Sequence, residues 1–281
     1  MKRMKNILIA LLLALLALPL TGQVRGKCGS VKLYSGQEKA KLISRQARLH
    51  ENALRFIGKP YVGGVLEKEP ERLVFEPDSV DCLTFVEYAL ALTFADEEGG
   101  FVSSIKENLQ QIRYRYNKID DYTDRLHYTL DWKLENCKCL RLTDITAQCP
   151  GAVETKKKID FMSTHAASYK QLSKNPQFID EIRVIEERLS QTPFYYIPTE
   201  AIGLRPSVIL PGDIILFTTT IAGLDIAHLG IVTTDEKGDF TFIHASSDAG
   251  KVIVNPEPLA DYCKKMKRVS GIIVLRVNEA E

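Results

Sequence analysis

Cys82 stands at the polar start of an otherwise apolar segment. The stretch DSVDCLTFVEYALALTF, residues 78–94, opens with two acids and a cysteine and then becomes almost wholly apolar. Asp78 or Ser79 can cap a helix here, which would place Cys82 in the first turn, where backbone N–H groups and the helix dipole favour a thiolate. A buried position in the core is the equal alternative, because cysteine is among the most buried residue types. A nucleophile at Cys82 would require a base from elsewhere in the chain.

Two of the five histidines lie in a β-rich region and could supply that base. His228 occurs in DIAHLGIV and His244 in FTFIHASS, and strands joined by TTDEKGD can bring the two side by side. A neighbouring imidazolium at a helix N-terminus favours a thiolate, and a third polar group must fix the ring that returns a proton to the leaving amine. We predict His228 as the acid/base and His244 as the orienting residue, with Asp225 as a rival for the second role. A structural role in a strand is the alternative for each histidine.

The remaining histidines and cysteines carry weaker signals. We interpret His127 and His165 as structural or surface residues. The cluster NCKCLRLTDITAQC allows a local disulfide, free thiols or, with His127 or His165, a zinc site. Zinc is the weakest of these, because C-x-C followed nine residues later by one cysteine is not a recognised zinc spacing, and we expect neither a metal nor a cofactor. The cysteines other than Cys82 are Cys28, Cys137, Cys139, Cys149 and Cys263.

Composition describes an ordinary globular protein. The chain has 281 residues, is 45% apolar and 26% charged, and carries 37 basic against 36 acidic residues for a formal net charge of +1. This length suits one large domain or two small ones. The balance of charge gives no broad basic surface, so we exclude nucleic-acid binding.

The N-terminus has the build of a secretory signal peptide. MKRMKNILIALLLALLALPLTGQVRG pairs a basic head with an apolar run and then small and polar residues. The apolar run of about 14 residues falls short of the roughly 20 that span a bilayer as a helix, so an uncleaved anchor is the lesser alternative. We predict a signal peptide at 1–22, a periplasmic or otherwise exported protein, and no stable membrane anchor after cleavage.

The chain beyond the leader changes from helical to β-rich patterns. Helical spacing predicts helices at about 40–57, 82–94, 101–117 and 176–190. From Val208 onward, short β-rich runs separated by Gly, Asp, Asn or Pro predict an antiparallel sheet; these are PGDIILFTT, IAHLGIVTT, DFTFIHASS, KVIVN and SGIIVLRV. The order predicts an α+β fold in which the sheet packs against the Cys82 helix. We expect one catalytic domain at 28–281.

The order of these motifs resembles a known family. GKPYVGG, then DC opening a helix, then PGDIILF, HLGIV and IHAS is similar to the NlpC-type papain-like cysteine hydrolases of bacterial cell walls. The agreement runs from Gly58 to Arg276. The resemblance implies a papain-like fold with Cys82 as the nucleophile, His228 as the base and His244 as the third polar residue. It also implies that Tyr61 and Asp81 line the site.

Two features of this sequence differ from the pattern of the wider family. Leu83 follows the cysteine where many of these peptidases have a serine that helps to hold the free amine of a peptide substrate. The long separation of Cys82 from His228 indicates an insertion at roughly 100–205. Longer chains with DCLTFVE, RLHYTLDW, FMSTH and GLDIAHLGIV resemble a subgroup described as N-acetylmuramoyl-L-alanine amidases, which cut the amide joining the sugar to the stem peptide.

Five further residues are candidates for substrate binding. Trp132 or Tyr128 could form a saccharide subsite, because a sugar ring can lie on an aromatic face, and Arg125 could face a carboxylate of the stem peptide. The stronger alternative for the two aromatic residues is one packed helix face, since they are four apart. Ser246 or Ser247 could bind substrate or form only a strand end.

The reaction that these residues suggest is amide hydrolysis through a thioester. Cys82 would attack the carbonyl, its own N–H and the Tyr61 hydroxyl would stabilise the oxyanion, and His228 would protonate the leaving amine. We expect a monomer that acts on peptidoglycan fragments (muropeptides). The alternatives are an endopeptidase that cleaves after D-glutamate, a non-catalytic cell-wall binding module and, more weakly, a zinc amidase.

Overall fold

The computed structural model describes residues 44–97, 102–203 and 206–279. The predicted signal peptide and Cys28 lie outside these ranges. No helix within them is long and apolar enough to cross a membrane.

The described strands form one eight-stranded antiparallel sheet. Its order is β2-β3-β8-β4-β5-β6-β7, and β1 pairs separately with β8. The strands are β1 Leu142–Asp144, β2 Val153–Thr155, β3 Phe194–Pro198, β4 Ile214–Thr219, β5 Ile226–Thr234, β6 Phe240–Ser246, β7 Lys251–Val254 and β8 Val269–Val277. The five predicted strands are β4 to β8, and together with the helices they confirm the α+β class.

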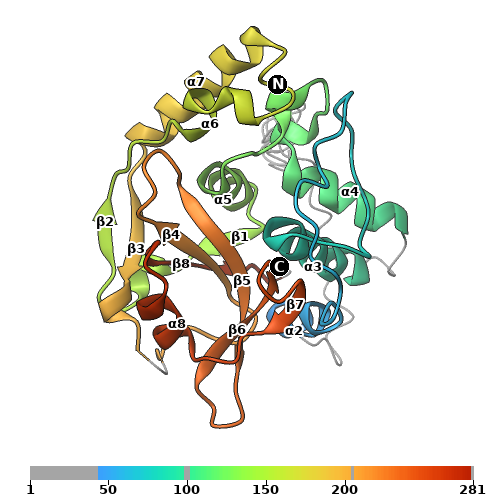
Figure 1. The fold of residues 1–281 in the computed structure, drawn as a ribbon. Coiled ribbons are helices and arrows are strands. Elements are labelled where there is room, and N and C mark those ends of the chain that lie inside the picture. Colours follow the sequence, from blue (N-terminus) through green and yellow to red (C-terminus); the bar gives the residue numbers. More distant parts are fainter. Residues whose placement is uncertain (1–43, 98–101, 204–205, 280–281) are drawn as a thin grey trace, which may run out of the picture.

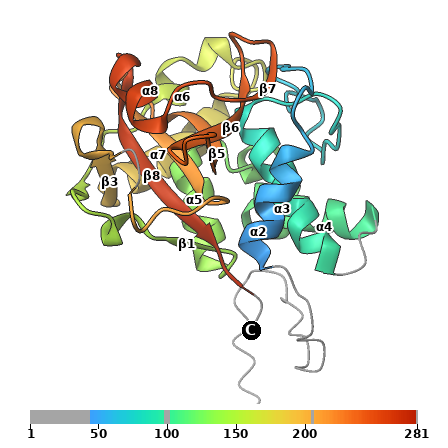
Figure 2. The same cartoon turned by 90° about the horizontal axis from the view of Figure 1, so that it is seen from below.

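Helices cover both faces of this sheet (Figures 1 and 2). The α-helices are α2 Arg45–Leu54, α3 Cys82–Glu97, α4 Val102–Arg113, α5 Thr129–Lys138, α6 Phe161–Thr164, α7 Pro176–Gln191 and α8 Leu259–Lys265. Helices α2 and α3 pack on one face and α8 on the other. Strand β4 shows why both faces are covered: Ile214 and Leu216 join the core beneath α3, whereas Ile215 and Phe217 join the core beneath α8. A strand buried on both faces reads as a continuous apolar run, as PGDIILF does.

The insertion is more regular than its sequence suggested. It contributes α4 to α7 and the three short strands β1, β2 and β3, which extend the sheet at one edge. The predicted helix at 101–117 ends at Arg113. Tyr114 is extended, with a φ of −117° and a ψ of 137°, which ends the α-helical path before a short 3₁₀ turn at Arg115–Asn117; Tyr116 within that turn has a φ of 55°.

Candidate active site

Asp81 caps the helix that carries Cys82. Its Oδ1 accepts from the Thr84 N–H at 2.8 Å, and its own N–H donates to Thr84 Oγ1 at 2.9 Å. This reciprocal pair begins α3 at Cys82, where the first N–H groups of the helix have no intrahelical acceptor. The cap is therefore neither Asp78 nor Ser79, as the sequence had suggested. Asp78 pairs instead with Lys59, at 2.6 Å.

A short extended segment joins the start of α3 to the sheet. The Pro60 carbonyl accepts from the Val80 N–H at 3.0 Å, and the Tyr61 N–H donates to the Gly250 carbonyl, beside β7, at 2.9 Å. This places Tyr61 beside the nucleophile. Burial raises the pKa of the Tyr61 hydroxyl, and the neighbouring Cys82 and Asp81 add to the rise.

The two sheet histidines meet, as their strands predicted. His228 Nε2 lies 2.7 Å from His244 Nδ1, and the ring planes are 85° apart. His244, only 4% exposed, follows Phe242 on the same face of β6, and the Phe217 ring stacks beside His228. Burial lowers the pKa of His228 to about 3 and that of His244 to about 4. Both imidazoles are therefore neutral at pH 7.

The Cys82 sulfur lies against the strand that carries His228. Burial raises the pKa of Cys82 to about 12, Asp81 adds to the rise, and hydrogen bonds from the backbone of Leu229 and Leu83 oppose it. Leu229 directly follows His228, so the sulfur touches the backbone next to the predicted base. The unliganded site holds a neutral thiol and neutral imidazoles. The ion pair expected from the helix N-terminus is therefore wrong for this state, because burial outweighs the N–H groups.

Sequence reasoning missed Tyr262, which also borders this site. It comes from the short helix α8, where its ring packs edge-on against Phe242 at 4.9 Å and lies 6.3 Å from the ring of His244. Burial raises the pKa of Tyr262 to about 12, and Cys82 is among the neighbours that add to the rise. The only sequence signal was a tyrosine in a seven-residue helix, which nothing connected with His244.

A cavity of about 240 Å³ adjoins the start of α3. Asp81 and Leu83 line it beside Cys82, and the insertion supplies most of the opposite wall, including His127. The sequence alone indicates a structural or surface residue at His127, and the structure places it in the cavity lining with its Nε2 2.7 Å from the Tyr122 carbonyl. A larger depression of about 640 Å³ lies along α7 and the lysines at 156–158. Cys82, His228 and His244 line neither cavity, but the smaller one is lined by both sequence neighbours of Cys82.

Two of the predicted substrate-binding residues line the cavity but are already engaged. The Arg125 guanidinium pairs with Glu67 at 2.8 Å and with Glu71 at 3.1 Å. The Tyr128 hydroxyl donates to Glu186 Oε1 at 2.7 Å. Two protein carboxylates already hold the charge of Arg125, and its interpretation as a partner for a substrate carboxylate stays a prediction.

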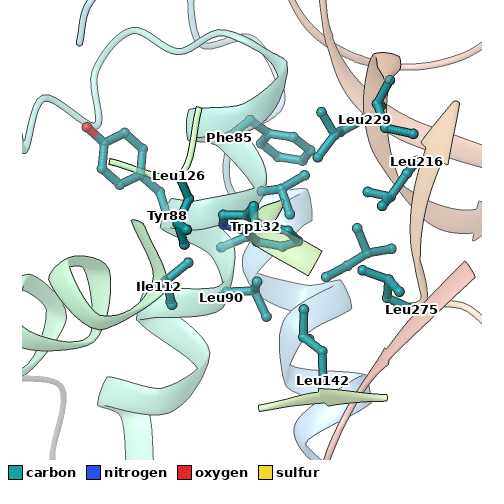
Figure 3. Close-up of a cluster of buried hydrophobic side chains, with 14 of the residues drawn as sticks. Phe85, Tyr88, Leu90, Ile112, Leu126, Trp132, Leu142, Leu216, Leu229 and Leu275 are labelled. Atoms are coloured by element: carbon teal, nitrogen blue, oxygen red, sulfur yellow. The ribbon is translucent and has the colours of Figure 1, made fainter. Parts of the chain in front are cut away.

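The other three candidates for substrate binding, Trp132, Ser246 and Ser247, do not line the cavity. Trp132 is 0% exposed and lies in the hydrophobic core with Leu90 and Leu142 around it (Figure 3), so its prediction as a sugar-stacking surface is wrong. The Ser246 hydroxyl accepts from the Ala249 N–H and shapes the turn after β6. Ser247 is exposed on that turn.

Asp225 orients the insertion rather than the histidine. Its Oδ2 accepts from the Leu130 N–H at 2.7 Å, at the start of α5, and its side chain belongs to the cavity lining. The ring of His228 is bonded to His244, so Asp225 does not take the rival role that the sequence had left open. Burial raises the pKa of Asp225 to about 6.

The cysteine cluster of the insertion contains no internal disulfide. Cys139 is disulfide-bonded, whereas Cys137 and Cys149 are free, as are Cys82 and Cys263. A local bridge within the cluster is therefore not formed. Among the residues that the structure describes, no group of three His, Cys, Asp or Glu side chains is placed to hold a metal ion.

Comparisons with known proteins converge on one family. A family model described as AmiA-like, N-acetylmuramoyl-L-alanine amidase-like, matches residues 52–272. A crystal structure of an N-acetylmuramoyl-L-alanine amidase from Bacteroides uniformis is 37% identical with a TM-score of 0.80, covering 84% of this chain and 99% of that one. A Bacteroides fragilis protein that is called a xylanase is 38% identical with a TM-score of 0.76, covering 81% and 100%.

A more distant protein, from Legionella pneumophila, shares the fold. It is 24% identical, has a TM-score of 0.63, and covers 84% of this chain and 89% of that one. No curated protein matches the chain.

Proposed function

We propose, from the chain's membership of the N-acetylmuramoyl-L-alanine amidase-like family, that it is a cysteine amidase of bacterial cell-wall material. The bond that we assign to it joins the lactyl group of N-acetylmuramic acid to L-alanine of the stem peptide. We propose that Cys82, His228 and His244 catalyse the hydrolysis of this bond in an NlpC-type, papain-like arrangement. The predicted leader would direct the protein to the periplasm or beyond, and N-terminal sequencing of exported protein would test this.

Because the thiol and both imidazoles are neutral in the unliganded site, the mechanism that we propose uses general-base activation in place of a preformed ion pair. In the tautomer that this mechanism requires, His228 Nε2 carries a proton and donates to His244 Nδ1, which leaves His228 Nδ1 free to accept. His228 then takes the Cys82 proton as the sulfur attacks the lactyl carbonyl, and returns it to the departing alanine amine. Water hydrolyses the thioester in the same sequence. The rigid pair of strands that carries the histidines would keep the ring direction fixed through both steps.

Two groups can stabilise the oxyanion of the tetrahedral intermediate. The Cys82 N–H stands at the first position of α3 and points along the helix dipole, and the Tyr61 hydroxyl lies beside the sulfur. The observation that carries the proposal is the contact of the Cys82 sulfur with the backbone after His228, combined with the bond of that histidine to His244.

Product analysis on purified muropeptides tests the assignment. We expect release of intact stem peptides with a free L-alanine amine, and loss of at least about 10⁴-fold in activity for Cys82→Ala. Cys137→Ala is the matched control, because Cys137 is a free, partly exposed thiol on α5, away from the site, and should retain activity. Full activity of Cys82→Ala would contradict the mechanism.

The same digest separates the alternatives. Cleavage after D-glutamate would make the protein an endopeptidase, as part of the wider superfamily resemblance suggests. New reducing ends without new amines would indicate a glycosidase, in keeping with the name of the B. fragilis protein. Binding to cell wall that survives Cys82→Ala, with no product from the wild type, would indicate a binding module.

A further inference from the structure

One buried arginine lacks the counter-charge that the others have. In the part of the chain that the structure describes, three arginines are buried: Arg113, Arg125 and Arg141. Glu87 holds the first at 2.7 Å and Glu67 the second at 2.8 Å. Arg141 is 7% exposed and has no carboxylate partner among the described residues. Burial alone lowers its pKa to about 10, so the guanidinium is still charged at pH 7, and a buried charge without a partner is strongly unfavourable.

The Arg141 guanidinium also has an unused donor. Its Nη2 donates to Gln111 Oε1 at 2.6 Å, whereas its Nη1 is buried and has no hydrogen-bond partner. Gln111 and Glu135 lie in the last turns of α4 and α5, whose carbonyl ends carry partial negative charge. That partial charge favours a guanidinium here, but Nη1 bonds to none of these carbonyl groups. The donor therefore needs a partner that the described residues do not supply.

A small hollow opens at this side chain. Arg141, Gln111 and Glu135 line it. Tyr116 and Asn117 are exposed residues of the same lining, so the hollow can be reached from solvent. Its volume is about 10 Å³, close to the minimum that one water molecule needs. The hollow therefore admits one monatomic ion or one water, and it excludes phosphate, sulfate and organic carboxylates.

The charges of the lining favour an anion over a water molecule. The carboxylate of Glu135 is compensated from outside the hollow, by Arg115 at 3.8 Å and by Lys138 at 3.7 Å. The charge of Arg141 is then left in excess. A water molecule would accept a hydrogen bond from Nη1 but bring no charge, whereas a halide ion accepts the bond and neutralises the guanidinium.

We propose that the hollow at Arg141 is a binding site for one small anion of the halide class, such as chloride, held by Nη1. Among the described residues, this hollow and the cavity beside Cys82 share no lining residue. The ion instead joins the ends of α4 and α5 to the sheet, because the Arg141 carbonyl accepts from the Asn278 N–H, just after β8, at 2.9 Å. The site acts on stability, and the inference is independent of the proposed amidase function.

The first test measures the melting temperature of the protein while sodium chloride replaces sodium gluconate. Gluconate is too large for the hollow, and a constant ionic strength keeps the screening of surface charges the same. Chloride at ten times its dissociation constant should raise the folding equilibrium constant about elevenfold and the melting temperature by roughly 3–6 °C. Equal melting temperatures in the two salts would overturn the proposal.

Two matched variants show whether the chloride effect belongs to Arg141. Arg141→Met keeps the length of the side chain and removes its charge, so its melting temperature should be the same in both salts. Arg183→Met is the control, because Arg183 is exposed, pairs with Asp180 and lies outside the hollow, and it should keep the full effect. An equal rise in both variants would be a general effect of the salt and would overturn the proposal. If Arg141→Met does not fold, Arg141→Gln, which keeps an amide donor, replaces it.

Bromide locates the ion directly in the wild-type protein. Crystals grown in sodium bromide should show an anomalous peak beside Arg141 Nη1. A water molecule at that position, or the Glu135 carboxylate turned onto Nη1, would overturn the proposal. A bromide peak without any dependence of the melting temperature on chloride would be binding at crystal concentration only, and it would overturn the proposal as well.

Discussion

The two halves of the molecule around the Cys82 cavity are built from different interactions. On the sheet side, neutral histidines are held by aromatic rings from β4, β6 and α8. On the insertion side, buried ion pairs hold the wall: Arg113 with Glu87, and Arg125 with Glu67 and Glu71. The sheet side therefore provides a neutral, shape-defined reaction centre, whereas the insertion provides a charged frame that excludes some ligands. This difference predicts different responses to mutation and to pH.

The largest expected effect is a loss of stability when the buried ion pair between Glu87 and Arg113 is broken. Glu87, 0% exposed on α3, pairs with Arg113 from α4, and Arg113 also donates to the Val74 carbonyl at 2.7 Å. Glu87→Ala leaves a buried guanidinium unpaired and should lower the free energy of unfolding by about 3–5 kcal/mol, measured by urea denaturation. Asp180→Ala breaks the exposed Asp180–Arg183 pair and should cost under about 1 kcal/mol.

The comparison between these variants is sharpened by removing both charges of the buried pair. A Glu87→Leu, Arg113→Met double variant should recover most of the loss, because a buried pair is often replaceable by apolar residues of similar volume. Equal destabilisation by Glu87→Ala and Asp180→Ala would show that the frame does not depend on the buried pair.

The next largest effect is on the catalytic rate and should leave the free energy of unfolding unchanged. Tyr61→Phe removes only a hydroxyl next to Cys82 and should lower kcat by about 10²–10³ if that hydroxyl stabilises the oxyanion. Tyr195→Phe, on the exposed face of β3, is the matched control. A kcat for Tyr61→Phe equal to that of the control would reduce Tyr61 to an anchor of its loop, the role that its backbone bond to Gly250 already supports.

The sheet side was largely predictable from sequence, and the insertion was not. Period-two patterns and turn residues located β4 to β8, and two histidines on strands joined by one hairpin had to lie near each other. The strands β1, β2 and β3 have three to five residues each, too few to establish a period. The insertion also depends on pairs such as Arg125 and Glu67, which are distant in sequence and whose contact no local pattern encodes.

Two errors near the site have the same physical origin. Trp132 on α5 and Tyr128 at its N-cap are both buried in one core cluster, and only the packing of α5 against β1 and the core decides that Tyr128 also borders the cavity whereas Trp132 does not. The charge state of Cys82 likewise depends on burial by β5, which a helix-start argument does not include. Local rules place a residue on an element but do not measure its desolvation.

The smallest expected effect is on the pH dependence of stability, to which the two sheet histidines and Asp225 contribute with opposite signs. His228 and His244 have folded-state pKa values lowered to about 3 and about 4, so below about pH 6.5 the unfolded chain binds protons that the folded chain does not. Stability should therefore fall as the pH decreases from about 6.5 toward 4. Asp225 has the opposite sign: its folded-state pKa is raised to about 6, so its contribution is present at low pH and is lost as the pH rises through that value.

The two contributions can be separated by comparing slopes of stability against pH for single variants. His244→Asn should flatten the fall of the free energy of unfolding between pH 6.5 and 4, by at most about 1.4 kcal/mol per pH unit. Asp225→Asn should steepen it, because it removes a group that gains protons in the folded state over this range. The raised pKa values of Glu71 and Glu87 act in the same direction as Asp225, whereas the lowered pKa of His127 acts with the histidine pair. Slopes that change with the same sign in both variants would contradict this account, because burying a histidine and burying a carboxylic acid shift the difference in bound protons between the folded and unfolded chain in opposite directions.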